Sequence, residues 1–137
     1  MLGDEYQVVL VGVSEEQKRT LPGNVTGITR TNSVKELAMI YSAADCAITL
    51  SKTESFSMVN LEAMCCGTPV ITYDVGGSKE SVEPAGGIVV KKGDLKAVAE
   101  AVRSNTARAE IDRESFDNER AVNDYVRIVQ KQGGLER

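Results

Sequence analysis

Short apolar runs alternate with longer amphipathic stretches over most of the 137 residues. The apolar runs are rich in β-branched residues and are bounded by glycine, proline or polar residues, a pattern typical of buried strands. Five strands are therefore predicted, over residues 6–12, 24–28, 46–50, 69–73 and 86–90.

The amphipathic stretches between these runs predict helices. One helix begins at a predicted capping box, Ser33 with Glu36. Its expected apolar face consists of Val34, Leu37, Ala38 and Tyr41. Ser78 is expected to cap a short helical turn, and Asp94 to cap a helix that ends near Ser104. Further helices are predicted over residues 15–21, 58–66 and 117–132.

Strands that alternate with helices, without hairpin signals, predict a parallel sheet with helices on both faces. The expected fold is a Rossmann-like, doubly wound α/β domain of about five strands. Residues 1–137 are expected to form this single domain. Ligands of such a sheet bind at the carboxyl ends of its strands, so a site is expected there.

Composition narrows the function classes. The net charge is −4, so the chain lacks the basic surface that nucleic-acid binding needs. It has no histidine, which excludes a Ser-His-Asp triad and a histidine-ligated zinc site within the chain. No apolar run approaches the ~20 residues that span a membrane, and no signal peptide opens the sequence. Cys46, Cys65 and Cys66 are expected to be buried thiols in a reducing compartment.

The most informative chemistry lies in residues 51–64. This segment leaves the third predicted strand, turns through small polar residues, and enters a helix near Ser57. With Ser57 as the cap, the free amides of Met58, Val59 and Asn60 would point toward the ligand face. The start of this helix is therefore a candidate phosphate site.

Two carboxylates flank this helix start. Glu54 lies in the loop before it, and Glu62 lies about 6 Å further along the helix axis at a rise of about 1.5 Å per residue. The helix is apolar on nearly every side, which predicts that it is buried and that Glu62 needs a partner. The hydroxyl groups of a nucleotide sugar would satisfy both carboxylates. The alternatives are a favourable helix dipole or a salt bridge to Lys79 or Lys52 for Glu62, and an exposed loop charge for Glu54.

The same segment resembles the group 1 glycosyltransferases, the large retaining family with the GT-B fold. Glu54 and Glu62 form a Glu-x7-Glu pair, and residues 62–71 continue as Glu-Ala-Met-x-x-Gly-x-Pro-Val-Ile, as in that family. Residues 41–45 and residues 76–80 match the family as well. The resemblance covers about residues 6–129, and it implies the C-terminal half of a GT-B fold, which is the nucleotide-sugar-binding domain.

The resemblance also implies a role for each matching position. Glu62 would bind the ribose hydroxyls of the donor nucleotide. Glu54, the expected catalytic residue, would bind hydroxyls of the donor sugar. Backbone contacts to the sugar and the phosphates would come from Phe56, Ser57, Met58 and Val59. The base would lie against the residues that follow the second strand, Arg30, Thr31 and Asn32.

The sequence departs from the family in three respects. Ser55 and Ser57 stand where the family commonly has glycine, which would narrow the sugar pocket. Nothing before Tyr6 matches the family's opening strand, which ends in Gly-Arg and precedes a Lys-Gly pair that grips the diphosphate. The acceptor-binding N-terminal domain has no counterpart either. The chain is therefore expected to be part of a longer enzyme, or a natural remnant that binds without catalysing.

The unmatched opening strand lies in the middle of the family's sheet. Without it, the first and third strands of this chain would each have an unpaired edge. These two strands are therefore expected either to pair directly or to meet another chain, as in a homodimer. The chain alone is expected to bind nucleoside diphosphates weakly, if at all, and to transfer no sugar.

The implied function is a retaining glycosyltransferase that moves a sugar from a nucleoside-diphosphate sugar to a glycan, lipid or small acceptor, as in polysaccharide biosynthesis. No cofactor and no metal is implied, and the absent N-terminal domain would hold the acceptor. The expected location is the cytoplasm, or the cytoplasmic face of the membrane for the full-length enzyme. The alternative is a non-catalytic module that binds nucleotide sugars or a protein partner. A receiver-like signalling domain is disfavoured, because residues 11–14 contain no acidic cluster.

Overall fold

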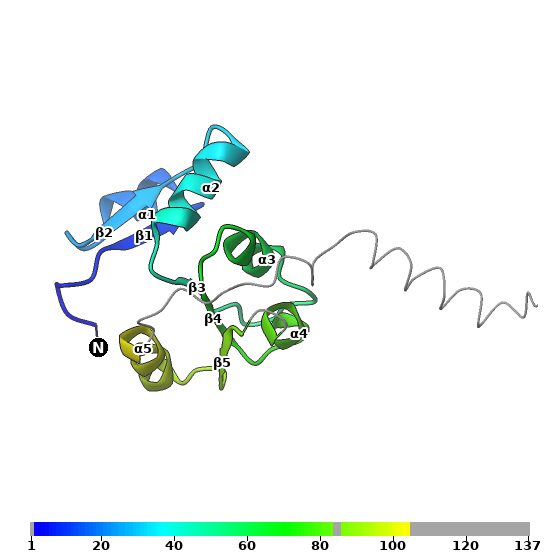
Figure 1. Ribbon diagram of the computed structural model, residues 1–137. Coiled ribbons are helices and arrows are strands. Elements are labelled where there is room, and N and C mark those ends of the chain that lie inside the picture. Colours follow the sequence, from blue (N-terminus) through cyan, green and yellow to red (C-terminus); the bar gives the residue numbers. More distant parts are fainter. Residues whose placement is uncertain (1, 84–85, 105–137) are drawn as a thin grey trace, which may run out of the picture.

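The computed structural model describes residues 2–83 and 86–104, in which strands and helices alternate (Figure 1). The strands are β1 (Val8–Val11), β2 (Val25–Ile28), β3 (Ala47–Thr49), β4 (Val70–Tyr73) and β5 (Ile88–Val90). The helices are α1 (Glu15–Arg19), α2 (Val34–Ala43), α3 (Met58–Cys65), α4 (Ser78–Val82) and α5 (Leu95–Ser104). The predicted α/β class is confirmed. The helix predicted over residues 117–132 lies outside the described residues.

The strands are parallel, as predicted, but they form two sheets instead of one. β1 pairs with β2, and the second sheet has the order β3-β4-β5. Of the two expected alternatives for β1 and β3, direct pairing does not occur among the described residues, and contact with another chain is not tested. The break between the sheets falls where the resemblance places a further strand. α1 packs against β2, and α3 contacts both β3 and β4, whereas α2 contacts α3 and its Tyr41 packs on the core of the larger sheet.

The larger sheet has helices on both faces, which confirms that part of the prediction (Figure 1). Successive side chains of β4 point to opposite faces because a strand has a period of two. Val70 packs with Ala63 and Met64 of α3 and with Val82 of α4. Ile71 and Tyr73 pack on the other face, with Val98 and Ala101 of α5. β4 is thus the buried centre of the sheet, and its helices hold the loops at its carboxyl edge.

The smaller sheet is less covered. Val9, Leu10 and Val11 of β1 are exposed, although the apolar run predicted a buried strand. The face predicted for α2 is also only partly right, because Val34 is 85% exposed while Leu37, Ala38 and Tyr41 are half-buried. Among the described residues, nothing pairs with the edge of β1 that faces away from β2.

Short-range signals at the helix ends are mostly confirmed. The Ser33 hydroxyl accepts the Glu36 amide at 3.1 Å, but the Glu36 carboxylate accepts the Asn32 amide instead of completing the box. Asp94 caps α5 by accepting the amide of Ala97 at 3.0 Å. Ser78 does not cap α4; it is the first residue of that helix, after Gly77, and it is buried.

None of the helices in the described ranges is long and apolar enough to cross a membrane. The prediction of three buried thiols is wrong. Cys65 is exposed and Cys66 is half-buried, because the end of α3 reaches the surface, and Cys46, just before β3, is half-buried as well.

Candidate functional site

The carboxyl ends of β3, β4 and β5 meet at one edge of the larger sheet, because the strands are parallel. The loop that joins β3 to α3 contains Glu54, and it contacts the loops that follow β4 and β5. The Gly77 amide donates to the Glu54 carbonyl at 3.3 Å. On the other side, the Lys92 ammonium donates to the Lys52 carbonyl at 2.7 Å. These contacts join three loops into one surface beside the start of α3.

The turn after β4 approaches the Glu54 loop so closely that it requires glycine. A Cβ atom on Gly76 would lie 1.6 Å from the Glu54 carbonyl oxygen, and one on Gly77 would lie 2.1 Å from the Ser55 carbonyl oxygen. Gly76 also has a φ of 49°, in the left-handed region that favours glycine. The pair Gly76-Gly77 therefore sets the backbone position of the loop that carries Glu54.

The start of α3 has the predicted cap. Ser57 is buried, and its hydroxyl accepts the Asn60 amide at 3.4 Å. The amides of Met58 and Val59 belong to the first turn, where no preceding helical carbonyl can accept them. Helix starts of this kind attract anions, because the free amides and the helix dipole both present positive charge.

The prediction that α3 is buried on all sides is wrong. Asn60, Ala63 and Met64 face the sheet and are fully buried, but Met58 is 61% exposed and Glu62 is exposed as well. One face of the helix packs on the sheet, while its first turn stands at the sheet edge. As a result, the exposed apolar side chains of Phe56, Met58 and Val59 surround the helix start.

The two candidate carboxylates differ in their surroundings. Among the described residues, the half-buried Glu54 carboxylate has neither a hydrogen-bond nor an ion-pair partner. The Glu62 carboxylate accepts a long hydrogen bond of 3.5 Å from the Tyr41 hydroxyl. In the described part of the chain, Glu62 forms no salt bridge to Lys79 or Lys52, the two partners considered for it. Lys79 instead pairs with Glu83 at 3.4 Å. Both carboxylates can therefore accept bonds from a ligand.

Tyr41 was expected to be a core residue, and the structure gives it a second role as the neighbour of Glu62. Burial raises the pKa of Tyr41 above its ordinary value, and the nearby Glu62 carboxylate raises it further. The phenol is thus held as a neutral donor toward Glu62. Because Tyr41 and Glu62 lie on different helices, the sequence pattern gave no signal for this contact.

A buried polar network below α3 also gave no signal in the sequence. The Asn60 side chain accepts from the Thr49 hydroxyl at 2.7 Å and donates to the Ser81 hydroxyl at 2.9 Å. Ser81 in turn donates to the Ser78 carbonyl at 2.7 Å. The network ties α3 to β3 and to α4. It thereby fixes the start of α3 relative to the turn at Gly76-Gly77.

Arg30 and Thr31 are not joined to this site. They follow β2, in the smaller sheet, where Arg30 is exposed and Thr31 is half-buried. No hydrogen bond or ion pair connects either residue to Glu54 or Glu62 within residues 2–83 and 86–104. The candidate residues near the start of α3 therefore lie together, whereas no such contact joins Arg30 and Thr31 to them among the described residues.

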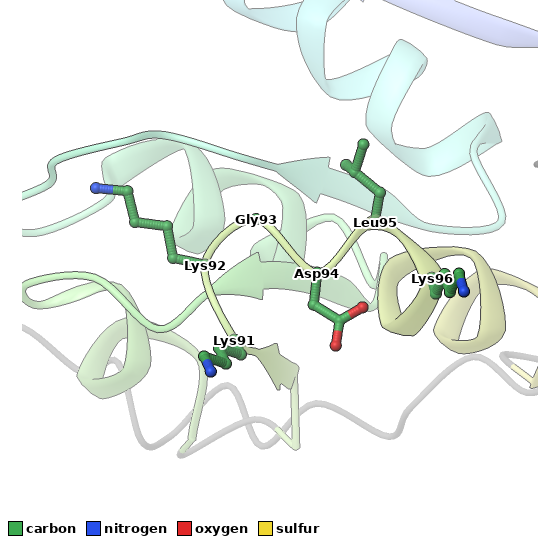
Figure 2. Close-up of a pocket in the computed structure, with 6 residues that line it drawn as sticks. All are labelled: Lys91, Lys92, Gly93, Asp94, Leu95 and Lys96. Atoms are coloured by element: carbon green, nitrogen blue, oxygen red, sulfur yellow. The ribbon is translucent and has the colours of Figure 1, made fainter.

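A shallow hollow lies next to the site, on the loop between β5 and α5 (Figure 2). Six consecutive residues, 91–96, line it. The side chains of Lys91, Lys92 and Lys96 point in different directions and do not converge on it (Figure 2). This hollow does not have the arrangement of an anion site. The described residues also contain no group of three or more acidic or cysteine side chains placed to hold a metal ion.

The fold and the position of the candidate site define a Rossmann-like α/β domain that uses the carboxyl edge of a parallel sheet. The chain belongs to the glycosyl transferases group 1 family, whose model matches residues 2–120. This confirms the resemblance seen in the motif around Glu54 and Glu62.

Individual relatives agree with the family. The chain is 43% identical over 79 residues to the D-inositol 3-phosphate glycosyltransferase of Geodermatophilus obscurus. This alignment covers 57% of the present chain and 18% of the relative. The enzyme of the same name from Saccharomonospora viridis is 37% identical over 78 residues, and this alignment covers 56% of the present chain and 18% of the relative. Sucrose-phosphate synthase from Thermosynechococcus elongatus has a similar structure, with a TM-score of 0.60 and 33% identity. That match covers 71% of this chain and 28% of the synthase chain, so the chain spans only a small part of each relative.

Proposed function

We propose that this chain is the single donor-binding domain of a retaining glycosyltransferase, which moves a sugar from a nucleoside-diphosphate sugar to a glycan, lipid or small acceptor. The observation that carries the proposal is the start of α3. There, free amides, two accessible carboxylates and exposed apolar side chains lie together at the carboxyl edge of a parallel sheet. A diphosphate, two sets of hydroxyl groups and a base are the matching features of a nucleotide sugar.

In this proposal, Glu62 binds the ribose hydroxyls and Glu54, the catalytic residue, binds hydroxyls of the sugar. The amides near Phe56, Ser57, Met58 and Val59 bind the sugar and the diphosphate. Charge that develops on the leaving diphosphate is then stabilised by preorganised amides. The base lies toward Arg30 and Thr31. This last assignment has the least support, because no contact joins that pair to the α3 site.

The names of the relatives support a donor site more than a particular acceptor. One name specifies D-inositol 3-phosphate, and the other specifies the synthesis of a sucrose phosphate. The two names differ in the acceptor, so the segment that these proteins share with this chain is better suited to binding a sugar donor than to binding a particular acceptor. The acceptor would be held by another domain of the whole protein.

The division of roles between the carboxylates is tested by calorimetry on Glu62→Ala and Glu54→Ala. The ligand is whichever of uridine, guanosine or adenosine diphosphate gives the largest thermal shift. Glu62→Ala should weaken binding about ten- to hundredfold, since hydrogen bonds to charged groups contribute ~1.5–3 kcal/mol. Glu54→Ala should leave the affinity for the bare diphosphate nearly unchanged, because its proposed partner is the sugar.

Glu100→Ala provides the matched control, since Glu100 is an exposed carboxylate on α5, away from the site. Equal losses from Glu62→Ala and Glu54→Ala would refute the assigned roles. The second candidate, a non-catalytic module, is favoured by the separation of Arg30 and Thr31 from the α3 site. It predicts that the whole protein binds nucleotide sugars without transferring a sugar, which an activity assay on the whole protein decides.

A further inference from the structure

Lys92 lies beside the candidate site but has no part in the proposed binding of the donor. It stands just after β5, on the loop that leads into α5, and it is exposed. Its ammonium group reaches back to the loop after β3 and donates to the Lys52 carbonyl at 2.7 Å. The distance is typical of a charged hydrogen bond. The bond crosses 40 residues of sequence to reach the loop that carries Glu54.

The Glu54 loop is held from two sides. On the β4 side, Gly77 donates its amide to the Glu54 carbonyl, and the lack of a side chain at Gly76 and Gly77 allows the close approach. On the β5 side, the Lys92 ammonium is the contact. The carbonyl groups that accept these two hydrogen bonds belong to Lys52 and Glu54. The backbone that carries the Glu54 side chain lies between them in the sequence.

We infer that Lys92 is a positioning residue, which sets the place of Glu54 by holding the Lys52 carbonyl. The inference rests on the proposed function only in assigning Glu54 to the donor sugar. Without the bond, the Glu54 loop keeps its contact with Gly77 but loses its anchor on the β5 side. Binding of the nucleotide part, at the amides of α3 and at Glu62, does not depend on this anchor.

Lys91 offers a matched control within the same loop. It is a neighbouring exposed lysine, and its ammonium makes no hydrogen bond or ion pair to the residues that the structure describes. Its side chain points away from that of Lys92 (Figure 2). Substitution of either lysine by methionine removes one positive charge next to the site, but only Lys92→Met removes the bond to Lys52.

The test measures two affinities by calorimetry, that of the best-binding nucleoside diphosphate and that of its glucose conjugate. Lys92→Met should weaken binding of the glucose conjugate by about three- to tenfold, which is less than the roughly ten- to hundredfold that a direct hydrogen bond to a charged group supplies. The bare diphosphate should bind as before. Lys92→Arg, which keeps a charged donor, should restore the affinity for the conjugate, and Lys91→Met should change neither affinity.

Amide hydrogen exchange in the ligand-free chain gives a second readout. Lys92→Met should speed exchange at Thr53, Glu54 and Ser55, whereas Lys91→Met should not. The inference is overturned if Lys92→Met weakens the diphosphate and the conjugate equally, because Lys92 would then contact the diphosphate. It is also overturned if exchange in this loop is unchanged. Failure of the whole protein to bind any nucleotide sugar refutes the proposed function, and the exchange measurement still decides the role of Lys92.

Discussion

Asn60 and Glu62 lie two positions apart on α3, and the structure gives them opposite surroundings. Asn60 is fully buried and makes hydrogen bonds to Thr49 and Ser81, whereas Glu62 is exposed with one long bond to Tyr41. The sequence pattern identified Glu62, because its spacing from Glu54 is characteristic of the family. It could not identify the role of Asn60, because the partners of a buried amide come from other elements that only the fold brings together.

This contrast predicts different effects on stability. Asn60→Ala should lower the free energy of unfolding by about 2 kcal/mol, because it removes two hydrogen bonds, to Thr49 and to Ser81, from a buried network. Glu62→Ala should change it by less than about 0.5 kcal/mol, as expected of an exposed side chain with a weak contact. Urea unfolding of both variants gives the comparison. A loss above ~2 kcal/mol for Glu62→Ala would show that Glu62 has a structural role instead of a ligand-binding one.

At the scale of elements, apolar runs and helix caps predicted where strands and helices lie, since these signals are local. Burial of a whole element is not local. The apolar sequence of α3 predicted a buried helix, but its first turn projects from the sheet edge and is exposed. The loops were the least predictable elements. Their positions depend on contacts such as Gly77 with Glu54, which join segments from different strands.

Gly77→Ala tests the importance of this contact between loops. A methyl group there would meet the Ser55 carbonyl oxygen at 2.1 Å, and neither backbone can move freely. The substitution should destabilise the chain by about 1–3 kcal/mol, in the range for overpacking of a buried site, and should weaken binding of the nucleotide sugar. Both are measurable by urea unfolding and calorimetry.

Gly23→Ala is the control for this substitution. A methyl group on Gly23 would meet no atom within 4 Å apart from its chain neighbours, and the φ of Gly23 is not positive. Its substitution should therefore be neutral or slightly stabilising. Wild-type stability in Gly77→Ala would show that the two loops can separate without cost. The close approach would then have no bearing on the site.

At the scale of the whole molecule, the class of fold was predictable and the continuity of the sheet was not. Alternation of strands and helices favours a parallel α/β arrangement, because parallel strands need crossover helices. The resemblance located the break between β1 and β3, and of the two alternatives expected there, direct pairing of these strands does not occur among the described residues. Pairing is a long-range event. Whether two edges meet depends on how the surrounding helices pack, which the pattern of a single strand does not encode.

The free edges of β1 and β3 predict that the chain associates with itself. Within residues 2–83 and 86–104, each edge presents unpaired backbone groups, and the exposed apolar residues Val9, Leu10 and Ile48 lie on these two strands. Unprotected edges of this kind pair readily with other chains. Light scattering should therefore give a mass above the 14.7 kDa of one chain, increasing with protein concentration.

A charged residue on β1 should oppose this association, because lysine on an edge strand disfavours pairing between sheets. Val9→Lys is therefore expected to shift the measured mass toward 14.7 kDa. Val34→Lys is the matched control: Val34 is 85% exposed, but it lies on α2 and not at a free edge. If both substitutions dissociate the chain equally, general surface charge is responsible and the strand edges are not. A single mass of one chain at every concentration would mean that the free edges of β1 and β3 are protected in solution.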